Sequence, residues 1–297
     1  MKRRSYLMTG GSGFVGQHLT KLLIERGDQV TVLDQTLSVN QSDGVTQVLG
    51  DLRDPAIFKD LPREWDGVIH LAGASIPSLF FDMAPVITNL GITLNLLDHI
   101  RDSRVLLVSS CHVYGSSDRP RHEDDPLIPQ GKYGLSKYLL EQTVSPFQGR
   151  LDIRVARPFN HLGPGLRPEL MVPSLLRRLS EDQSGEMVQM TGQNSVRDFI
   201  DVRDVIAAYL AIIDLEKPQH HVFNVCTGRA TSIEEVVQVV LDLLGQQREI
   251  EFKGGPKSQD DIPFLVGVPD RLNAASGWQA AFTLCDSISS MIANQAI

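Results

Sequence analysis

Cysteine, aromatic residues and long hydrophobic runs are all scarce in this 297-residue sequence, which has 3 cysteines and 6% aromatic residues. Cys111, Cys226 and Cys285 are odd in number and widely spaced, which indicates reduced thiols and no cysteine-based zinc site. No stretch approaches the length of a membrane span, and Gly10 and Gly11 interrupt the first apolar segment before it could form the core of a signal peptide. We therefore expect a cytoplasmic protein with no membrane partner.

A strong excess of charge of either sign is lacking too. The 28 basic and 36 acidic residues give a formal net charge of −8, and no basic run provides the positive surface that nucleic acid requires. Hydrophobic residues make up 42% and charged residues 22% of the chain, which are ordinary values for a globular protein that buries a core. The composition argues against a nucleic-acid partner, and no residue spacing suggests a metal site.

A regular alternation of strand-like and helical periods is present in the first half of the chain. Near-continuous apolar strands are typical of a parallel sheet covered by helices on both faces, so we predict a doubly wound α/β (Rossmann) sheet. The expected strands are 6–8, 30–33, 45–49, 67–71, 105–109 and 151–156, and the expected helices are 14–26, 87–100 and 132–144.

Beyond residue 157 the pattern loosens, which indicates a smaller C-terminal α/β lobe for the substrate. We expect a glycine- and proline-rich loop at 160–168, a strand near 187–190, and helices near 172–180, 202–215 and 233–244. The helix at 202–215 is apolar enough to return and pack on the sheet. The predicted division is a dinucleotide-binding domain of residues 1–157, with 198–226 returning to it, and a substrate-binding lobe of 158–197 and 227–297.

Glycines spaced by three mark the first strand-to-helix turn. Gly10, Gly13 and Gly16 let backbone N–H groups approach a pyrophosphate and let the helix pack closely on the strand, although a plain glycine-rich turn has the same composition. Asp34 ends the second strand 18 residues after Gly16, where its carboxylate can accept hydrogen bonds from ribose hydroxyls and would repel a 2′-phosphate. We predict NAD as the cofactor, with NADP as the alternative; an ordinary turn aspartate is the other interpretation of Asp34.

Tyr133 is followed by Lys137 within a helical segment, so both side chains lie on one face of the helix. A neighbouring cation, together with the positive field of an oxidised nicotinamide, is expected to lower the tyrosine pKa from its reference near ~10 toward working pH. The same spacing is common on solvated helices. With the glycine turn upstream, it indicates a tyrosine that exchanges a proton with a sugar or alcohol oxygen.

Six motifs occur in the order seen in extended short-chain dehydrogenases/reductases, and the sequence resembles that family over essentially its whole length. These motifs are residues 9–16, 70–73, 109–115, 133–137, 157–160 and 197–202. The resemblance implies that Ser110 hydrogen-bonds the reacting oxygen and that Lys137 holds the nicotinamide ribose. With the glycine turn, it predicts a cofactor site formed by Gly10, Gly13, Phe14, Val15, Gly16, Asp34, Asp51, Leu52, Leu71, Ala72, Gly73, Asn89, Tyr133, Lys137 and Pro158. The predicted substrate contacts are Ser75, Ser110, Cys111, His112, Asn160, Arg197 and Lys257.

Residues 157–165 most resemble the GDP-4-keto-6-deoxy-D-mannose reductases, which reduce a nucleotide-linked 4-keto sugar. Related 4,6-dehydratases carry an acid after the serine, whereas this chain has Cys111 and His112, so dehydration is disfavoured. His112 is interpreted as a catalytic acid or base beside the ketone, or as a substrate-binding or structural residue. Lys257 is a looser substitute for an arginine that grips the diphosphate in the family, which leaves the nucleotide base open.

We expect the chain to catalyse NAD(P)H-dependent reduction of the C4 keto group of a nucleotide-linked 4-keto-6-deoxyhexose, with Tyr133 as proton donor. The same residues, removing and then returning hydride, would give a nucleotide-sugar 4-epimerase. The third interpretation is a dinucleotide-binding sensor without turnover, although such proteins usually lose the tyrosine and lysine. The resemblance further implies a homodimer packed through helices 87–100 and 132–144.

Overall fold

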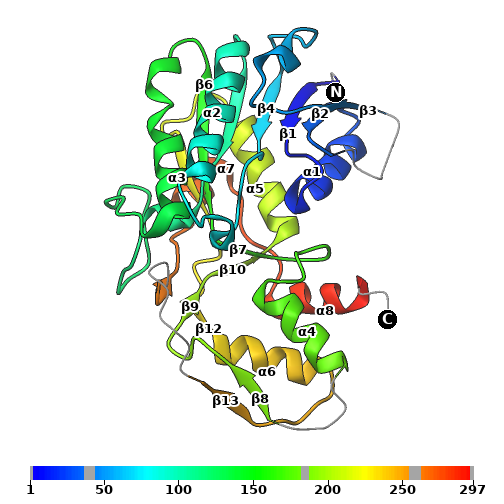
Figure 1. The fold of residues 1–297 in the computed structure, drawn as a ribbon, viewed down its shortest axis with the longest axis vertical. Helices are drawn as coiled ribbons and strands as arrows, with labels where there is room; N and C mark the ends of the chain where they lie inside the picture. Colours follow the sequence, from blue (N-terminus) through cyan, green and yellow to red (C-terminus); the bar gives the residue numbers. More distant parts are fainter. Residues whose placement is uncertain (1–2, 37–43, 182–186, 254–261, 295–297) are drawn as a thin grey trace.

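A parallel sheet of seven strands, in the order β11-β6-β5-β4-β1-β2-β3, forms the upper part of the molecule in Figure 1. The computed structural model describes residues 3–36, 44–181, 187–253 and 262–294. All six strand pairings in this sheet are parallel, as predicted. The strands are β1 (Ser5–Thr9), β2 (Gln29–Asp34), β3 (Val45–Leu49), β4 (Gly67–His70), β5 (Arg104–Val108), β6 (Asp152–Pro158) and β11 (Val222–Val225).

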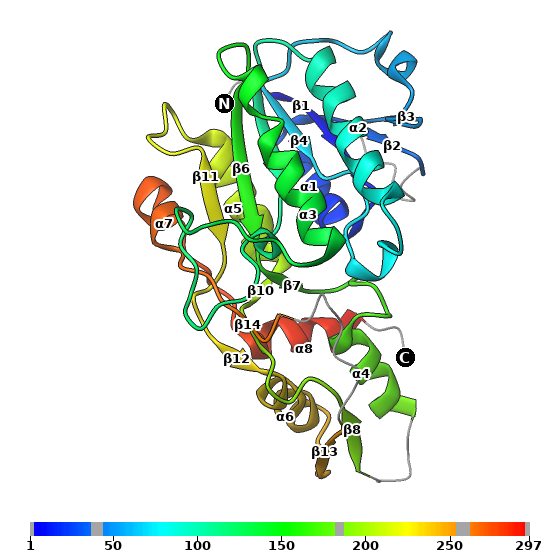
Figure 2. The ribbon, with the colours of Figure 1, turned by 60° about the vertical axis from the view of Figure 1, so that its left-hand side comes forward.

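Helices cover both faces of the sheet, which confirms the doubly wound architecture (Figures 1 and 2). Successive strand residues point to opposite faces, so Met8 packs in one hydrophobic core and Leu7 in the other. Because both faces of the sheet are buried, the sequences of the strands are continuous apolar runs. The covering helices are α1 (Phe14–Glu25) and α5 (Val202–Asp214) on one face, and α2 (Ala84–His99) and α3 (Gly131–Gln142) on the other.

The remaining elements form a C-terminal lobe beyond the carboxyl ends of the strands (Figure 2). Its own core contains Leu176, Val236 and Ile288 from three helices. The lobe comprises α4 (Met171–Glu181), β8 (Val188–Met190), β9 (Val196–Arg197), β12 (Thr231–Ser232), α6 (Ile233–Leu243), β13 (Ile250–Phe252), β14 (Phe264–Leu265) and α8 (Leu284–Asn294). The parallel pair β7 (Asn160–Leu162) and β10 (Phe199–Asp201) lies between the sheet and the lobe.

Three buried carboxylates, spaced three residues apart, attach the C-terminal segments to this junction. Asp198 accepts hydrogen bonds from the Thr227 and Gly228 backbone N–H groups at 2.9 and 2.8 Å. Asp201, the N-cap of α5, accepts a hydrogen bond from the Ser287 hydroxyl at 2.7 Å. Asp204 accepts two hydrogen bonds from the Ala281 and Phe282 N–H groups, each at 3.0 Å. We call these three residues the aspartate row.

The predicted loop at 160–168 is wrong at its start, because β7 occupies residues 160–162 and pairs with β10 some forty residues later. A three-residue strand is too short to show a period of its own.

Strand β11 and helices α7 (Asp270–Ser276) and α8 had no predicted counterpart. The 3-10 turns are η1 (Pro55–Phe58), η2 (Pro77–Leu79), η3 (Cys111–Val113) and η4 (Ser145–Phe147). Among the residues described, no helix combines the length and apolar character that crossing a membrane requires.

Candidate active site

The glycine turn between β1 and α1 is too tight for side chains. Gly10 has a φ of 73°, and a Cβ there would lie 2.7 Å from the backbone nitrogen of Ala72. A Cβ on Gly16 would lie 2.6 Å from the Gly10 carbonyl oxygen. Gly13 is the N-cap of α1 and offers no side-chain oxygen to its first turn. This crowding brings backbone to backbone at a helix N-terminus, the arrangement that suits a pyrophosphate.

Asp34 faces this turn from the end of β2. Its carboxylate accepts hydrogen bonds from the Ser12 N–H at 2.9 Å and the Gln35 N–H at 2.7 Å. The neighbouring Asp51 is paired with Arg53, whose hydrogen bonds lower the Asp51 pKa to about 2. Arg53 is a cation at this end of the predicted site that sequence reasoning missed, because it follows the third strand rather than the second.

A directed chain of buried side chains underlies the cofactor side. The Thr93 hydroxyl donates to the Asn89 carbonyl oxygen at 2.8 Å, so its oxygen must accept from His70 Nε2 at 2.9 Å. His70 Nδ1 is then an acceptor, and the Thr9 hydroxyl donates to it at 2.6 Å. Burial lowers the His70 pKa to about 3, consistent with this neutral tautomer. We call these four residues the Thr9–Asn89 chain.

Asn89 extends the chain toward the predicted catalytic helix. Its side-chain amide donates to the Ala74 carbonyl oxygen and to the Ser136 hydroxyl, both at 3.0 Å, and its oxygen accepts from the Ala74 N–H at 2.8 Å. A Cβ on Gly73 would lie 2.7 Å from that oxygen, so the segment after β4 fits closely around the asparagine. Asn89 therefore holds Gly73 and Ala74 against α3.

Tyr133 and Lys137 lie on α3 beside the end of β5. Ser110 lies close enough to Tyr133 to lower its pKa, and Lys137 Nζ donates to the Val108 carbonyl oxygen at 2.9 Å. Burial lowers the Lys137 pKa to about 8 and raises the Tyr133 pKa to about 12, despite the lowering effect of Ser110. The lowering expected from Lys137 together with an oxidised nicotinamide stays a prediction, because in the protein alone desolvation is the largest influence on the Tyr133 pKa.

Two rings flank the Tyr133 ring edge to face. The His112 ring centroid lies 5.1 Å away at 68° and the Phe80 centroid 5.5 Å away at 62°. Burial, helped by the Arg197 charge, lowers the His112 pKa to about 4. Phe80 was not among the predicted site residues, although the apolar run around it is a signal in the sequence.

Cys111 is 2% exposed, and burial raises its pKa to about 12, so it is a neutral thiol at pH 7. Arg197 reaches the Pro263 carbonyl oxygen at 3.3 Å and acts electrostatically on both Cys111 and His112. The structure therefore brings the lobe residue Arg197 toward the end of β5, where Ser110 lies.

The other predicted residues lie around the same edge. Asn160 begins β7, and its side-chain oxygen is buried with no hydrogen-bond partner among the described residues. Leu71, Ala72 and Gly73 follow β4, Phe14 and Val15 begin α1, and Pro158 ends β6. Leu52 is buried, whereas Ser75 is exposed. Lys257 lies outside the described residues. The assigned roles stay predictions.

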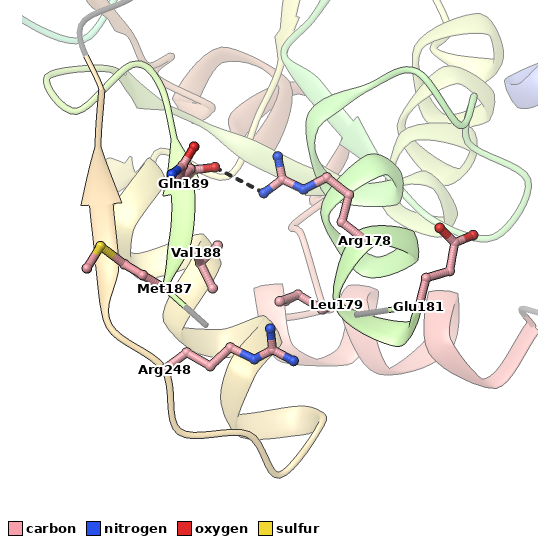
Figure 3. Close-up of a pocket in the computed structure, with 7 residues that line it drawn as sticks. All are labelled: Arg178, Leu179, Glu181, Met187, Val188, Gln189 and Arg248. Atoms are coloured by element: carbon pink, nitrogen blue, oxygen red, sulfur yellow. Dashed lines mark hydrogen bonds between the residues drawn. The ribbon is translucent and has the colours of Figure 1, made fainter. Parts of the chain in front are cut away.

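A separate pocket of about 470 Å³ opens at the far end of the lobe, between α4 and β8 (Figure 3). Arg178 and Arg248 border it, and Arg178 donates to the Gln189 carbonyl oxygen at 3.0 Å. None of the predicted site residues lines this pocket.

Comparison with known proteins fits this geometry. Residues 6–226 match the NAD dependent epimerase/dehydratase family. The chain belongs to this family. A relative, the GDP-6-deoxy-D-mannose reductase of Pseudomonas aeruginosa, is 30% identical over 303 residues, which cover 97% of this chain and 95% of the relative. This family member is thus a nicotinamide-dependent nucleotide-sugar enzyme of the extended short-chain dehydrogenase/reductase type, as predicted.

Two solved structures share the whole fold. RMD from Pseudomonas aeruginosa, complexed with NADPH, has a TM-score of 0.82 and 30% identity over 98% of both chains. UDP-glucose 4-epimerase from Thermotoga maritima, with UDP-glucose, has a TM-score of 0.85 and 25% identity over 98% of both chains. The similarity therefore includes both a reductase-like and an epimerase relative.

Proposed function

We propose that this family member reduces the C4 keto group of a nucleotide-linked 4-keto-6-deoxyhexose. The observation that carries the proposal is the cluster of Ser110, Tyr133 and Lys137 at the carboxyl end of β5, at the same edge of the parallel sheet as the glycine turn after β1. The similarity to GDP-6-deoxy-D-mannose reductase supports reduction, and the guanosine diphosphate series is the first to test.

The cofactor fits between the glycine turn and α3. Gly10, Gly13 and Gly16 would hold the pyrophosphate, Asp34 the adenosine ribose and Lys137 the nicotinamide ribose. Asp34 favours NAD, while the nearby Arg53 offers a charge for the 2′-phosphate of NADP. When bound, the reduced dinucleotide supplies the hydride.

The remaining chemistry belongs to the side chains. Ser110 donates a hydrogen bond that orients the C4 oxygen, and Tyr133 gives its phenolic proton to that oxygen as the carbonyl becomes an alcohol. The raised Tyr133 pKa keeps the phenol protonated before the reaction. The Lys137 ammonium then stabilises the phenolate until it is reprotonated. Because Cys111 and His112 are neutral and neither is a carboxylic acid, the site gives no support to dehydration.

A 4-epimerase is the second candidate, and the similarity to a UDP-glucose 4-epimerase supports it. Tyr133 would first take the proton of the C4 hydroxyl as hydride leaves C4 for the oxidised dinucleotide. After the keto sugar turns over, hydride would return to the opposite face of C4, and Tyr133 would give the proton back to the C4 oxygen. A sensor without turnover is the third, and the retained Tyr133 and Lys137 weigh against it.

The decisive experiment adds nucleotide sugars to the purified chain and follows the absorbance of the reduced dinucleotide. Stoichiometric oxidation of NAD(P)H by a 4-keto-6-deoxy sugar is the expected result. A C4 epimer formed without net oxidation supports the epimerase, and no product with any sugar supports the sensor. Tyr133→Phe should lower kcat by about 10²–10⁴-fold while leaving the dissociation constant of the dinucleotide unchanged. Full turnover by this variant would contradict the mechanism.

We also propose a homodimer packed through α2 and α3, which lie side by side on one face of the sheet (Figure 2). Ile87, near the start of α2, is 67% exposed, as expected of an apolar residue that a second copy covers. Light scattering on Ile87→Glu tests this, with a shift to monomer expected. A cytoplasmic location also remains a proposal, which the three free cysteines support.

A further inference from the structure

We propose that Phe80 forms the subsite for C6 of the sugar and selects a C6 methyl group over a hydroxymethyl or a carboxylate. This inference rests on the proposed function, because it takes the C4 oxygen to lie at Tyr133. It goes beyond that function in naming the residue that sets the substrate class.

Covalent geometry brings C6 close to Tyr133. C5 is bonded directly to C4, and C6 to C5, so C6 is three bonds from the oxygen that accepts the Tyr133 proton. That oxygen must lie within hydrogen-bond distance of the phenol during the transfer. The groups beside the Tyr133 ring are therefore placed to contact the substituents of C3 and C5. In the structure, two rings contact Tyr133 edge to face: Phe80, with its centroid 5.5 Å away, and His112, with its centroid 5.1 Å away.

The two neighbours differ in what they can recognise. C3 of a hexose carries a hydroxyl, which loses its hydration on binding and needs a hydrogen-bond partner. A neutral imidazole donates through one nitrogen and accepts through the other, so His112 can supply that partner. The phenyl ring of Phe80 can supply none. The C3 hydroxyl gains a hydrogen-bond partner only if it lies beside His112. This orientation of the sugar puts C6 beside Phe80.

Phe80 is built into the site rather than lying on the surface. It is 6% exposed, whereas the next residue, Phe81, is 86% exposed. Phe80 is the C-cap of the turn η2, and its N–H donates to the Pro77 carbonyl oxygen at 3.0 Å. Lys132, next to Tyr133, donates from Nζ to the Phe81 carbonyl oxygen at 2.6 Å. The segment that carries Phe80 is thus tied to the helix that carries Tyr133.

The surroundings of the Tyr133 ring also disfavour a charged C6. Cys111, the other residue whose electrostatic effect reaches Tyr133, is a buried neutral thiol. Arg197, a cation of the lobe, acts on His112 and Cys111, which is the C3 side in this arrangement. A C6 carboxylate against the phenyl ring would lose its hydration there, and the ring offers it no hydrogen bond in return.

The test compares two stable sugars in the oxidation direction. The purified full chain is given NAD or NADP with GDP-6-deoxy-D-mannose or GDP-D-mannose, which differ by one C6 hydroxyl, and kcat/KM is taken from initial rates of dinucleotide reduction. We expect the 6-deoxy sugar to be preferred by about 10²-fold, the discrimination that an apolar pocket achieves against an added hydroxyl. Equal kcat/KM values would overturn the inference alone. No turnover of either sugar above the Tyr133→Phe background would overturn the proposed function, and the inference with it.

Three variants test whether Phe80 is the residue that causes the preference for the 6-deoxy sugar. Phe80→Ser should reduce it to about 10-fold or less, because a hydroxyl then replaces the apolar wall. Phe80→Leu should retain most of it, since the wall stays apolar, and it controls for loss of the aromatic ring. Phe81→Ser is the matched control, an exposed neighbour of the same type, and should leave the preference unchanged. A preference that survives in Phe80→Ser, or that falls equally in Phe81→Ser, would overturn the assignment.

Discussion

The cofactor side of the site and the C-terminal lobe are held in place by different chemistry. On the cofactor side, glycines without room for a Cβ and the neutral Thr9–Asn89 chain fix the backbone. The lobe is instead attached through the aspartate row, whose carboxylates accept N–H and O–H donors from later segments. We therefore expect shape to determine how the dinucleotide fits, whereas hydrogen bonds to carboxylates attach the lobe that carries predicted substrate contacts.

Gly16→Ala should have the largest effect of these variants, a loss of dinucleotide affinity. The new Cβ would meet the Gly10 carbonyl and the Gly11 backbone at 2.6 Å, which displaces the turn. The dissociation constant of NAD(P)H, measured by fluorescence, should rise about 10³-fold, the loss expected for two hydrogen bonds to a charged phosphate. Gly91→Ala on α2 is the control, because its Cβ meets nothing within 4 Å. Unchanged affinity in Gly16→Ala would show that the turn does not hold the pyrophosphate.

Acid should act on buried groups of both regions, because the pKa values of the buried histidines and of Asp198 shift in opposite directions. Burial lowers the pKa of His70 to about 3 and those of His112 and His161 to about 4, whereas burial raises the Asp198 pKa to about 6. As pH falls from 6.5, the unfolded chain protonates three histidines that stay neutral in the folded protein, so stability is lost. Below pH 6 the folded protein holds one proton on Asp198 that the unfolded chain lacks, which offsets one of the three.

Between pH 6 and 4 the net uptake on unfolding approaches two protons. The free energy of unfolding should then fall by about 3 kcal/mol per pH unit. Urea titrations across this range measure the slope, and His161→Gln should reduce it by about 1.4 kcal/mol per pH unit. A slope that His161→Gln leaves unchanged would contradict the buried neutral state of this residue.

Asp198→Asn should act on the lobe side. One oxygen becomes an amide that cannot accept from Gly228 or Thr227, and a buried donor left without an acceptor costs about 1–3 kcal/mol. Since Arg197 precedes it, we expect the KM of the nucleotide sugar to rise about 10-fold, with dinucleotide affinity unchanged. Asp204→Asn is the matched control, because it also loses backbone donors but lies on α5; it should lower stability without changing KM.

Asp34→Ala should give the smallest effect, a change in cofactor preference of several-fold. Removing the carboxylate beside the turn lowers repulsion of a 2′-phosphate and leaves Arg53 able to pair with it. Dissociation constants for NADH and NADPH, measured on the same preparations, give the ratio. If the unmodified chain and Asp34→Ala give the same ratio, Asp34 does not determine the preference between NADH and NADPH.

The sequence predicts the cofactor side better than the lobe for a physical reason. The strands of the sheet and the turn at Gly10 and Gly16 depend on local pattern and on residues adjacent in the chain, so periodicity and spacing reveal them. Phe80 and the donors to Asp198 come together only through tertiary packing, and β7 finds its partner far along the chain. The effect of burial on the Tyr133 pKa has the same origin, because spacing shows the lysine but not the depth of burial.

The aspartate row also bears on how the chain folds as it is made. Its carboxylates lie at residues 198–204, yet Thr227, Gly228, Ala281, Phe282 and Ser287 supply the donors described above. Synthesis delivers the N-terminal sheet first. Asp198 therefore meets its partners about thirty residues later, whereas Asp201 and Asp204 wait for the last segment of the chain. A chain cut before residue 281 would leave Asp201 and Asp204 without these donors, so it should form the sheet but not a soluble native state.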